Sequence, residues 1–557
     1  MIRTLVVVSP EREAGLAPWL DYLRHAGASE VVLTTDHDRL LGLTGVDVVV
    51  ASTSRGPLAD EQEAALCAFV RAGGGFVGLN GTTHAWRENR AFVRLLGSEP
   101  DGRLPETELL ARAADPGHAV VRRLPLPIAV REATASLTRL EPDCEVVLSA
   151  RWRLHEVPLA YCRSVGRGRV FACGVGASPS TVADPAVQQL LHRALRYAAG
   201  VDERGSVGVG LLGYGAIAAE HVAAIAAVPG LRLAAVCDRS PARLAAAAGA
   251  APAAAVHPEP AALLADPAVD LVVVSTPPNT HHQMARAALA AGKHVVVEKP
   301  FCLTRRDADD LQTLARAQAR VLTVFQNRRW DPDFLAVQQV VGSGRLGEVF
   351  HAETFVGGHH HPCNLWHSDA DVSGGVIFDW GAHYLDWLLA LLPGRVERVS
   401  AFAQKRCWHD VTNHDQLRLV MTLTGGVQAE FMHSDIAAAR KPKWYLLGTR
   451  AALVGHWREE QLCTRTEAGA VAWERLLPTD LPCDLHVLTP DGSGGTHDER
   501  LALPAPPPHA FYRNLAGHLL CGEPLAVSPA SALRTVAVME AAMRSAAATG
   551  DPVPVDV

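Results

Sequence analysis

Apolar positions in the first two hundred residues fall into two alternating patterns. Strand-like runs at 4–8, 31–34 and 46–51 have the length of buried strands, and residues 16–26 carry apolar side chains at helical spacing. This alternation is typical of βαβ units. We therefore expect residues 1–200 to form a flavodoxin-like, doubly wound α/β domain.

The same rhythm restarts at residue 207 and leads into a glycine-rich turn. An apolar run over 207–211 is followed by Gly213 and Gly215, and Ala218 begins a helical stretch. Between a strand and a helix, Gly-x-Gly-x-x-Gly/Ala is typical of a dinucleotide site, because it allows a tight turn, close approach of a pyrophosphate and close helix packing. A plain glycine-rich turn is the alternative. We expect a Rossmann domain over residues 205–325.

The pattern changes again beyond residue 326. The later apolar runs are rich in β-formers and are separated by turns instead of helices, which predicts an open, mostly antiparallel sheet. These runs lie at 349–355, 396–404, 417–423, 427–434 and 443–447. We expect residues 326–557 to form an α+β domain that carries the substrate floor and the face of a homo-oligomer, either a dimer or a tetramer.

Composition narrows the functional classes. The 557 residues carry a net charge of −7 and contain no basic run, which argues against nucleic acid or a membrane surface as partner. The 11 cysteines show no framework spacing, and no apolar run is long enough for a membrane span or a signal sequence. These features predict a cytoplasmic protein with a small-molecule substrate.

Asp238 closes the second strand of the expected Rossmann domain, 23 residues beyond Gly215, which is close to the spacing of a ribose-binding acid. A carboxylate there accepts hydrogen bonds from ribose hydroxyls and repels a 2′-phosphate, so NAD is favoured. Arg239 keeps NADP possible. A helix-capping role for Asp238 is compatible with the ribose role.

Glu298 and Lys299 follow a run of three valines at 295–297 and precede Pro300. Ligands bind at the carboxyl edge of an open α/β sheet, which is where these two charged residues would lie. Pro300 keeps Lys299 out of helical geometry. A surface ion pair is the alternative, but the position favours a catalytic lysine.

Asp379 and His383 lie four residues apart in a stretch with helical spacing, so we expect them on one helix face. The ordinary pKa of histidine, about 6.5, suits proton transfer, and a neighbouring carboxylate can raise that pKa and orient the ring. A simple helix-surface pair is the alternative.

These motifs resemble the Gfo/Idh/MocA family of NAD(P)-dependent oxidoreductases over residues 206–550. The segments 276–281, 292–294 and 298–300 match at the family's spacing. The resemblance implies that Lys299, Asp379 and His383 are catalytic and that the bond before Pro300 is cis.

We expect cofactor contacts from Gly213, Tyr214, Gly215, Ala216, Ile217, Asp238, Arg239, Glu298 and Lys299. The resemblance implies further cofactor contacts from Thr276, Pro277, Asn279 and His281. We expect substrate contacts from Lys299, Arg328, Trp366, His367, Asp379 and His383.

Three N-terminal segments, 58–81, 115–125 and 166–172, resemble the ThuA-like family of class I glutamine-amidotransferase-like domains. Asn80 stands where that family carries a nucleophilic cysteine or a histidine, and Ala177 stands where it tends to have a second histidine. A neutral amide is neither a nucleophile nor a base near pH 7. We expect a structural or substrate-shaping domain, with active-site roles for His84, Trp86 and His118 as the alternative.

A second group of potential metal ligands lies near the substrate side. Its members are His359, His360, His361, Cys363, His367, His409 and His414. Their spacing matches no known zinc site, so we expect no metal and a substrate-lining loop.

The residues leave three functions open. The first is an NAD-dependent dehydrogenase of a secondary hydroxyl in a sugar, glycoside or cyclitol, in which His383 takes the proton and Lys299 hydrogen-bonds the oxygen. The second is a redox-neutral enzyme that cleaves glycosides by oxidation, elimination and re-reduction, which the fusion to a ThuA-like domain favours. The third is a non-catalytic sugar sensor, and the presence of Lys299, Asp379 and His383 argues against it.

Overall fold

The computed structural model describes residues 1–132, 135–176, 178–201, 205–363, 365–459, 461–465, 471–475, 479 and 481–555. Ala177, the second departure from the ThuA-like pattern, lies outside the described residues. The chain divides into two compact units. Unit 1 comprises Met1–Ser206, Val228–Gly230 and Tyr512–Leu525, and unit 2 comprises Val207–Ala227, Leu231–Phe511 and Ala526–Val557.

Unit 1 is built on a nine-stranded sheet with the order β2-β1-β3-β4-β11-β10-β9-β6-β7. Its parallel half contains β1 (Ile2–Val8), β2 (Ser29–Thr34), β3 (Val48–Ser52), β4 (Gly75–Gly78) and β11 (Gly168–Cys173). Along β1, Leu5 and Val7 face one buried cluster and Val6 and Val8 face another. A strand buried on both faces is typical of a doubly wound sheet, so the expected fold class is confirmed.

Helices cover both faces of this parallel half. One cluster includes side chains of α1 (Pro10–Ala26) and α6 (Pro185–Ala198), and the other includes side chains of α2 (Asp60–Arg71) and α4 (Arg90–Leu96). The sequence patterns did not reveal that the sheet continues with an antiparallel half. That half contains β10 (His155–Val165), β9 (Glu145–Trp152), β6 (Thr107–Ala113) and β7 (Ile128–Glu132).

Unit 2 begins with a parallel Rossmann sheet of order β14-β13-β12-β15-β16-β17. These strands are β12 (Val207–Leu212), β13 (Leu231–Cys237), β14 (Ala255–His257), β15 (Leu271–Val274), β16 (His294–Val297) and β17 (Leu322–Val324). The strand order reverses between β12 and β15. Ligands bind at this switch point, outside the carboxyl ends of the strands. The connecting helices are α7 (Ala218–Ala227), α8 (Pro241–Ala250), α9 (Pro260–Ala265), α10 (His281–Ala290) and α11 (Arg305–Ala317).

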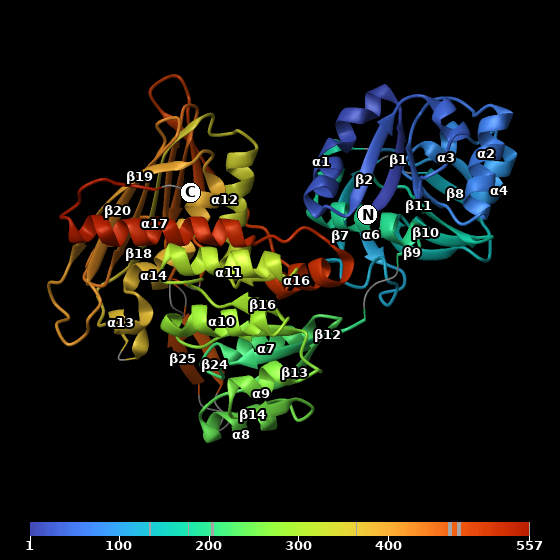
Figure 1. Ribbon diagram of the computed structural model, residues 1–557. Coiled ribbons are helices and arrows are strands. Elements are labelled where there is room, and N and C mark those ends of the chain that lie inside the picture. The colour runs from blue at the N-terminus through green and yellow to red at the C-terminus, as the bar shows by residue number, and fades with distance from the viewer. Residues whose placement is uncertain are drawn as a thin grey trace. The chain divides into compact units, whose positions relative to one another are not determined.

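The second sheet of unit 2 has the order β27-β26-β23-β22-β18-β21-β20-β19-β28, and every neighbouring pair in it is antiparallel except β18 and β21. Its strands are β18 (Val349–Gly357), β19 (Val396–Gln404), β20 (Gln416–Leu423), β21 (Gln428–Ser434), β22 (Trp444–Gly448), β23 (Ala452–His456), β26 (Asp484–Pro490), β27 (Thr496–Arg500) and β28 (Val553–Pro554). The long helix α17 (Pro529–Ala547; Figure 1) packs against β19 and against α15 (Gly381–Leu391). This is the open, mostly antiparallel sheet that the sequence predicts.

Shorter elements complete the described chain. They are α3 (Thr82–Ala85), α5 (Pro179–Val182), α12 (Pro332–Gly342), α13 (Ala370–Ser373), α14 (Val376–Asp379), α16 (Ala510–Cys521), the strand pair β5 (Ser98–Arg103) and β8 (Ala135–Leu140), and the strand pair β24 (Gln461–Arg465) and β25 (Val471–Arg475). Single 3₁₀ turns lie at His37–Leu41, Pro278–Thr280, Asn327–Trp330 and Trp366–Ser368. Within the described ranges, no helix combines the length and apolar character required to cross a bilayer.

Candidate active site

The glycine turn after β12 has the geometry of a pyrophosphate cradle. Gly213 adopts a φ of +100°, and a Cβ atom there would lie 2.6 Å from the carbonyl oxygen of Ser275, so only glycine fits. A Cβ atom on Gly215 would meet nothing within 4 Å, which leaves that side of the turn open. Ala218 is buried and begins α7. The residues present therefore fit a dinucleotide at the start of this helix.

Asp238 lies directly beside this turn. Its Oδ2 accepts a 2.8 Å hydrogen bond from the backbone N–H of Tyr214, and its Oδ1 accepts one of 2.8 Å from the N–H of Ser240. The guanidinium of Arg243 is 3.6 Å from Oδ2, and Arg239 is exposed. The carboxylate of Asp238 thus lies next to the glycine turn, which is where an acidic residue binds the ribose in dinucleotide-binding folds.

The loop after β15 is tied to the loop after β16 by His281. Its ring is 1% exposed, with Nε2 at 2.8 Å from the carbonyl oxygen of Thr276 and Nδ1 at 2.7 Å from that of Pro300. Burial lowers the pKa of His281. The imidazole therefore holds the two strand ends together, whereas Asn279 is exposed. Direct cofactor contacts from Thr276, Asn279 and His281 stay predictions.

Lys299 and Asp379 meet at the carboxyl edge of the Rossmann sheet. Nζ of Lys299 donates a 2.5 Å hydrogen bond to Oδ1 of Asp379, and each side chain is about a quarter exposed. Burial alone would raise the pKa of Asp379, but the charge and hydrogen bond of Lys299 outweigh it and hold the pKa below its ordinary value. The peptide bond before Pro300 is cis, as the family resemblance implies.

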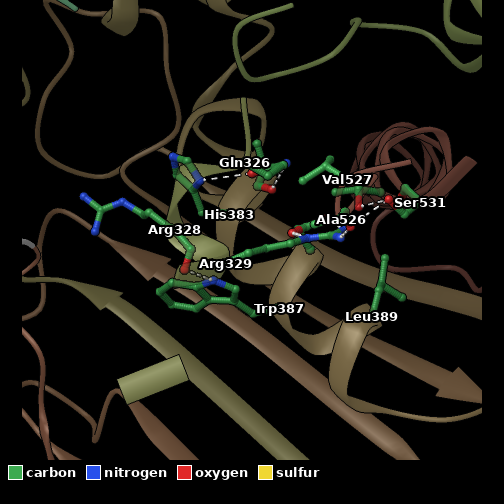
Figure 2. Close-up of polar contacts among 12 residues, drawn as sticks. Gln326, Arg328, Arg329, His383, Trp387, Leu389, Ala526, Val527 and Ser531 are labelled. Atoms are coloured by element: carbon green, nitrogen blue, oxygen red, sulfur yellow. Dashed lines mark hydrogen bonds and ion pairs between the residues drawn. The ribbon is translucent and has the colours of Figure 1, made fainter. Parts of the chain in front are cut away.

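His383 is fixed by Gln326, a residue that the sequence patterns did not identify. The amide N–H of Gln326 donates a 2.9 Å hydrogen bond to the carbonyl oxygen of Ala382, so its Oε1 is left as an acceptor 3.2 Å from Nδ1 of His383 (Figure 2). Nδ1 must then carry the proton, and Nε2 of the neutral ring carries the free electron pair.

The pKa of His383 is shifted in the direction opposite to the one that a neighbouring carboxylate would cause. A neighbouring carboxylate can raise the pKa of a histidine, but burial lowers the pKa of His383 well below 6.5, and the positive charges of Lys299 and Arg328 act in the same direction. The single helix expected around Asp379 and His383 is two helices, α14 and α15, joined at Trp380. In the part of the chain that the structure describes, no hydrogen bond or ion pair joins Asp379 to His383, because Asp379 pairs with the lysine.

Two further histidines act electrostatically on Asp379: His367 and His433 both lower its pKa. His367 stacks on Trp366 with ring centroids 3.7 Å apart, and burial lowers its pKa. His433 lies on β21 and is 2% exposed. Sequence reasoning missed it because one polar residue inside a strand carries no local signal. Among the described residues, no group of three or more potential ligands could hold a metal ion.

The two arginines at 328 and 329 have different surroundings. Nη1 of Arg328 donates to Asp331 at 3.2 Å and to the carbonyl oxygen of Thr479 at 3.0 Å. Arg329 binds both carboxylate oxygens of Asp386, each at 2.6 Å. Arg329 is thus a structural anchor for α15, and the substrate role of Arg328 stays a prediction.

In unit 1, the amide of Asn80 is committed to the protein. Its Nδ2 donates to the carbonyl oxygen of Gly174 at 2.7 Å and to Oε2 of Glu132 at 3.3 Å. An amide NH₂ group has two hydrogens, so both donors are used. Trp86 lies wholly in the core, and Nδ1 of His118 lies 3.3 Å from the N–H of Val120.

Three parts of this chain match known protein families. Family models fit residues 207–326 (oxidoreductase family, NAD-binding Rossmann fold), 334–454 (GFO/IDH/MocA C-terminal domain) and 10–198 (trehalose utilisation, ThuA). The uncharacterised oxidoreductase YdgJ of Escherichia coli (strain K12) is 34% identical over 265 residues, which are 46% of this chain and 73% of that protein. The chain belongs to the Gfo/Idh/MocA family of oxidoreductases.

Other relatives agree with this family. The scyllo-inositol 2-dehydrogenase (NADP(+)) IolW of Bacillus subtilis (strain 168) is 27% identical over 283 residues, 50% of this chain and 77% of that protein. The crystal structure of an NAD-binding protein from Listeria innocua superposes with a TM-score of 0.53 and 27% identity, over 63% of this chain and 97% of that one. As a Gfo/Idh/MocA member, the chain is an NAD(P)-dependent oxidoreductase with an N-terminal ThuA domain.

Proposed function

We propose that this Gfo/Idh/MocA oxidoreductase oxidises a secondary hydroxyl of a sugar, glycoside or cyclitol, with NAD⁺ favoured over NADP⁺ as the cofactor. One observation carries the proposal: Lys299 is hydrogen-bonded to Asp379 beside a neutral, oriented His383, at the carboxyl edge of the Rossmann sheet. The name of IolW, an inositol dehydrogenase, supports a polyhydroxylated ring as substrate.

His383 acts as the base. Its lowered pKa keeps the ring neutral at pH 7, and the hydrogen bond to Gln326 leaves the electron pair on Nε2. A neutral imidazole with its second nitrogen anchored accepts a hydroxyl proton without changing tautomer. The positive charges of Lys299 and Arg328 then favour release of that proton.

Lys299 stabilises the developing negative charge on the substrate oxygen. Its ammonium carries three hydrogens, of which one goes to Asp379. Among the described residues no other group accepts a hydrogen bond from this ammonium, so two hydrogens can go to the substrate. Asp379 fixes the direction of the ammonium. When bound, the nicotinamide supplies the hydride acceptor; Gly213, Gly215 and Asp238 are the residues that would hold the dinucleotide.

The test is turnover of the purified full-length protein with a panel of sugars, glycosides and inositols and either NAD⁺ or NADP⁺. We expect Lys299→Ala and His383→Ala to lower turnover by about 10²-fold or more while the Kd for NAD⁺ stays near that of the unaltered protein. Asp371→Asn, on an exposed residue of α13, is the matched control. Full activity in both active-site variants would exclude the proposal.

The ThuA match over residues 10–198 favours a second candidate, the redox-neutral cleavage of glycosides. This reaction would use the same Lys299 and His383, because its first step is the same oxidation. Release of an aglycone without net formation of NADH identifies it. NADH formation equal to substrate consumption identifies the dehydrogenase.

We also propose a division into domains at 1–200, 205–325 and 326–557, with a non-catalytic N-terminal domain, and a homo-oligomeric protein. The amide of Asn80 is held by Gly174 and Glu132, which supports a structural role for that position. Turnover unchanged by Asn80→Ala would agree with this role.

A further inference from the structure

His221 is a buried histidine that the mechanism above does not use. It lies in α7, the helix that begins at the glycine turn, and its side chain is 0% exposed. Its Nε2 is 3.0 Å from Oε1 of Glu298, whose side chain is 10% exposed. In the described part of the chain, Oε1 of Glu298 makes no hydrogen bond of good geometry, and the ion-pair contact with the imidazole is its close polar contact. The imidazole is therefore the polar group that faces this buried carboxylate oxygen.

The other oxygen of Glu298 acts on the catalytic strand end. Its Oε2 accepts a 3.0 Å hydrogen bond from the backbone N–H of Lys299. Lys299 in turn reaches Asp379 through its side chain. A continuous chain of polar contacts thus runs from α7 through Glu298 to the lysine.

Aromatic packing holds the imidazole of His221 in place. Its ring centroid is 4.7 Å from that of Phe325, which is 4.8 Å from the ring of Phe511. The backbone N–H of Phe325 donates a 2.8 Å hydrogen bond to the carbonyl oxygen of Val297, the last residue of β16. His221 therefore contacts groups attached to the ends of both β16 and β17, and has little freedom to turn away from Glu298.

We propose that His221 is a positioning residue that sets Lys299 through Glu298 and so connects the nucleotide-binding helix to the reacting lysine. This proposal rests on the function proposed above for Lys299. A buried carboxylate whose partner is removed is costly, so Glu298 would rotate toward other donors. The Lys299 N–H would then lose its acceptor, and the ammonium would lose its fixed position beside Asp379.

The first experiment is a double-mutant cycle with His221→Phe, which keeps an aromatic ring against Phe325 and removes Nε2. We expect kcat to fall by about 10-fold, because small misplacements of reacting groups have effects of this size, while the Kd for NAD⁺ changes less than about 3-fold. In a Lys299→Ala background, His221→Phe should have no further effect on the residual kcat, because residues that act through one group are not additive. An equal loss in both backgrounds would overturn the proposal, as would a weaker Kd with unchanged kcat.

The second experiment does not require turnover. Competitive labelling with acetic anhydride, read by mass spectrometry, measures the reactivity of each lysine in the intact protein. His221→Phe should change the labelling rate of Lys299 by about 3-fold or more and leave Lys293 unchanged, because Lys293 is held by the carbonyl oxygens of Asp266 and Val269. Identical Lys299 labelling in the two proteins would overturn the positioning role even if no substrate is turned over. If the protein did not carry out the proposed oxidation but His221 did position Lys299, His221→Phe would still change the labelling rate of Lys299.

Two further variants exclude a simple loss of folding. Glu298→Gln keeps the shape of the side chain and should reproduce the change in Lys299 labelling with an unfolding midpoint close to that of the unaltered protein. His282→Phe replaces another carboxylate-paired histidine, 2.8 Å from Asp310, and should change neither kcat nor Lys299 labelling. An effect of His282→Phe as large as that of His221→Phe would show that the response is unspecific and would overturn the proposal.

Discussion

Nζ of Lys299 and Oδ1 of Asp379 are 2.5 Å apart, although 80 positions separate the two residues in the chain. The lysine extends from the end of a Rossmann strand, and the aspartate ends a short helix that precedes the antiparallel sheet. Lys299, the lysine proposed to act on the substrate, is thus held by the segment that leads into α15, the helix of the proposed base His383. This arrangement leads to several measurable consequences.

The role of Asp379 is tested by a substitution that removes only its negative charge. Asp379→Asn keeps the size of the side chain but removes the anion that orients the Lys299 ammonium, so we expect kcat to fall by about 10- to 100-fold with little change in the Kd for NAD⁺. Steady-state kinetics and fluorescence titration of the cofactor measure the two quantities. Unchanged kcat would show that Lys299 needs no anionic partner.

The hydrogen bond from His383 to Gln326 predicts a tautomer effect. Gln326→Leu removes the acceptor for Nδ1–H, so part of the His383 population would carry its proton on Nε2 and would not act as a base. We expect kcat to fall by about 10-fold. Gln338→Leu, on an exposed position of α12, is the control, and an equal loss in that variant would rule out this explanation.

The lowered pKa of His383 predicts the pH dependence of oxidation. The base acts in its neutral form, which is favoured at every pH above its pKa, and that pKa lies well below 6.5. The kcat/KM for alcohol oxidation should therefore stay level from pH 8 down through about 6.5 and decline only in more acidic buffer. A half-maximal value at or above pH 6.5 would contradict the neutral, buried histidine.

Cofactor preference is predicted to depend on Asp238. Its carboxylate beside the glycine turn repels a 2′-phosphate, and the nearby Arg243 partly offsets that charge. Asp238→Ser should weaken NAD⁺ binding by about 10-fold, because hydrogen bonds to a charged group contribute about 1.5 kcal/mol or more. The same substitution should raise the affinity for NADP⁺ relative to that for NAD⁺, because it removes the charge that repels the 2′-phosphate. Titrations with both cofactors test this expectation, and Arg243→Ala should shift the preference toward NAD⁺.

Stability is predicted to depend strongly on Arg329. Its guanidinium binds the buried Asp386 with two hydrogen bonds of 2.6 Å, and Arg329→Met would leave that carboxylate without its main partner. We expect the free energy of unfolding to fall by about 3 kcal/mol. Arg286→Met breaks an exposed pair with Asp310 and should cost less than about 1 kcal/mol. Similar losses of unfolding free energy in both variants would show that burial of the ion pair does not determine how much the pair stabilises the protein.

The sequence predicts the fold well where structure follows local pattern. The runs at 207–211 and 295–297 lie within strands β12 and β16, because a continuous apolar run suits a strand covered on both faces. The helical stretch around Asp379 and His383 is divided at Trp380, a detail that spacing alone does not encode. The antiparallel half of the sheet in unit 1 is not predicted from the sequence, because the pairing of its strands depends on partners elsewhere in the chain.

The amino-acid sequence by itself determined the order of strands, turns and helices, the glycine turn at 213–215 and the presence of Lys299, Asp379 and His383. Periodicity and backbone geometry are local properties, so they can be read along the chain. Only the tertiary structure decided that Lys299 pairs with Asp379, that Gln326 fixes the tautomer of His383, and that His221 faces Glu298. Protonation and orientation depend on burial and on partners from distant segments, and these exist only once the chain has folded.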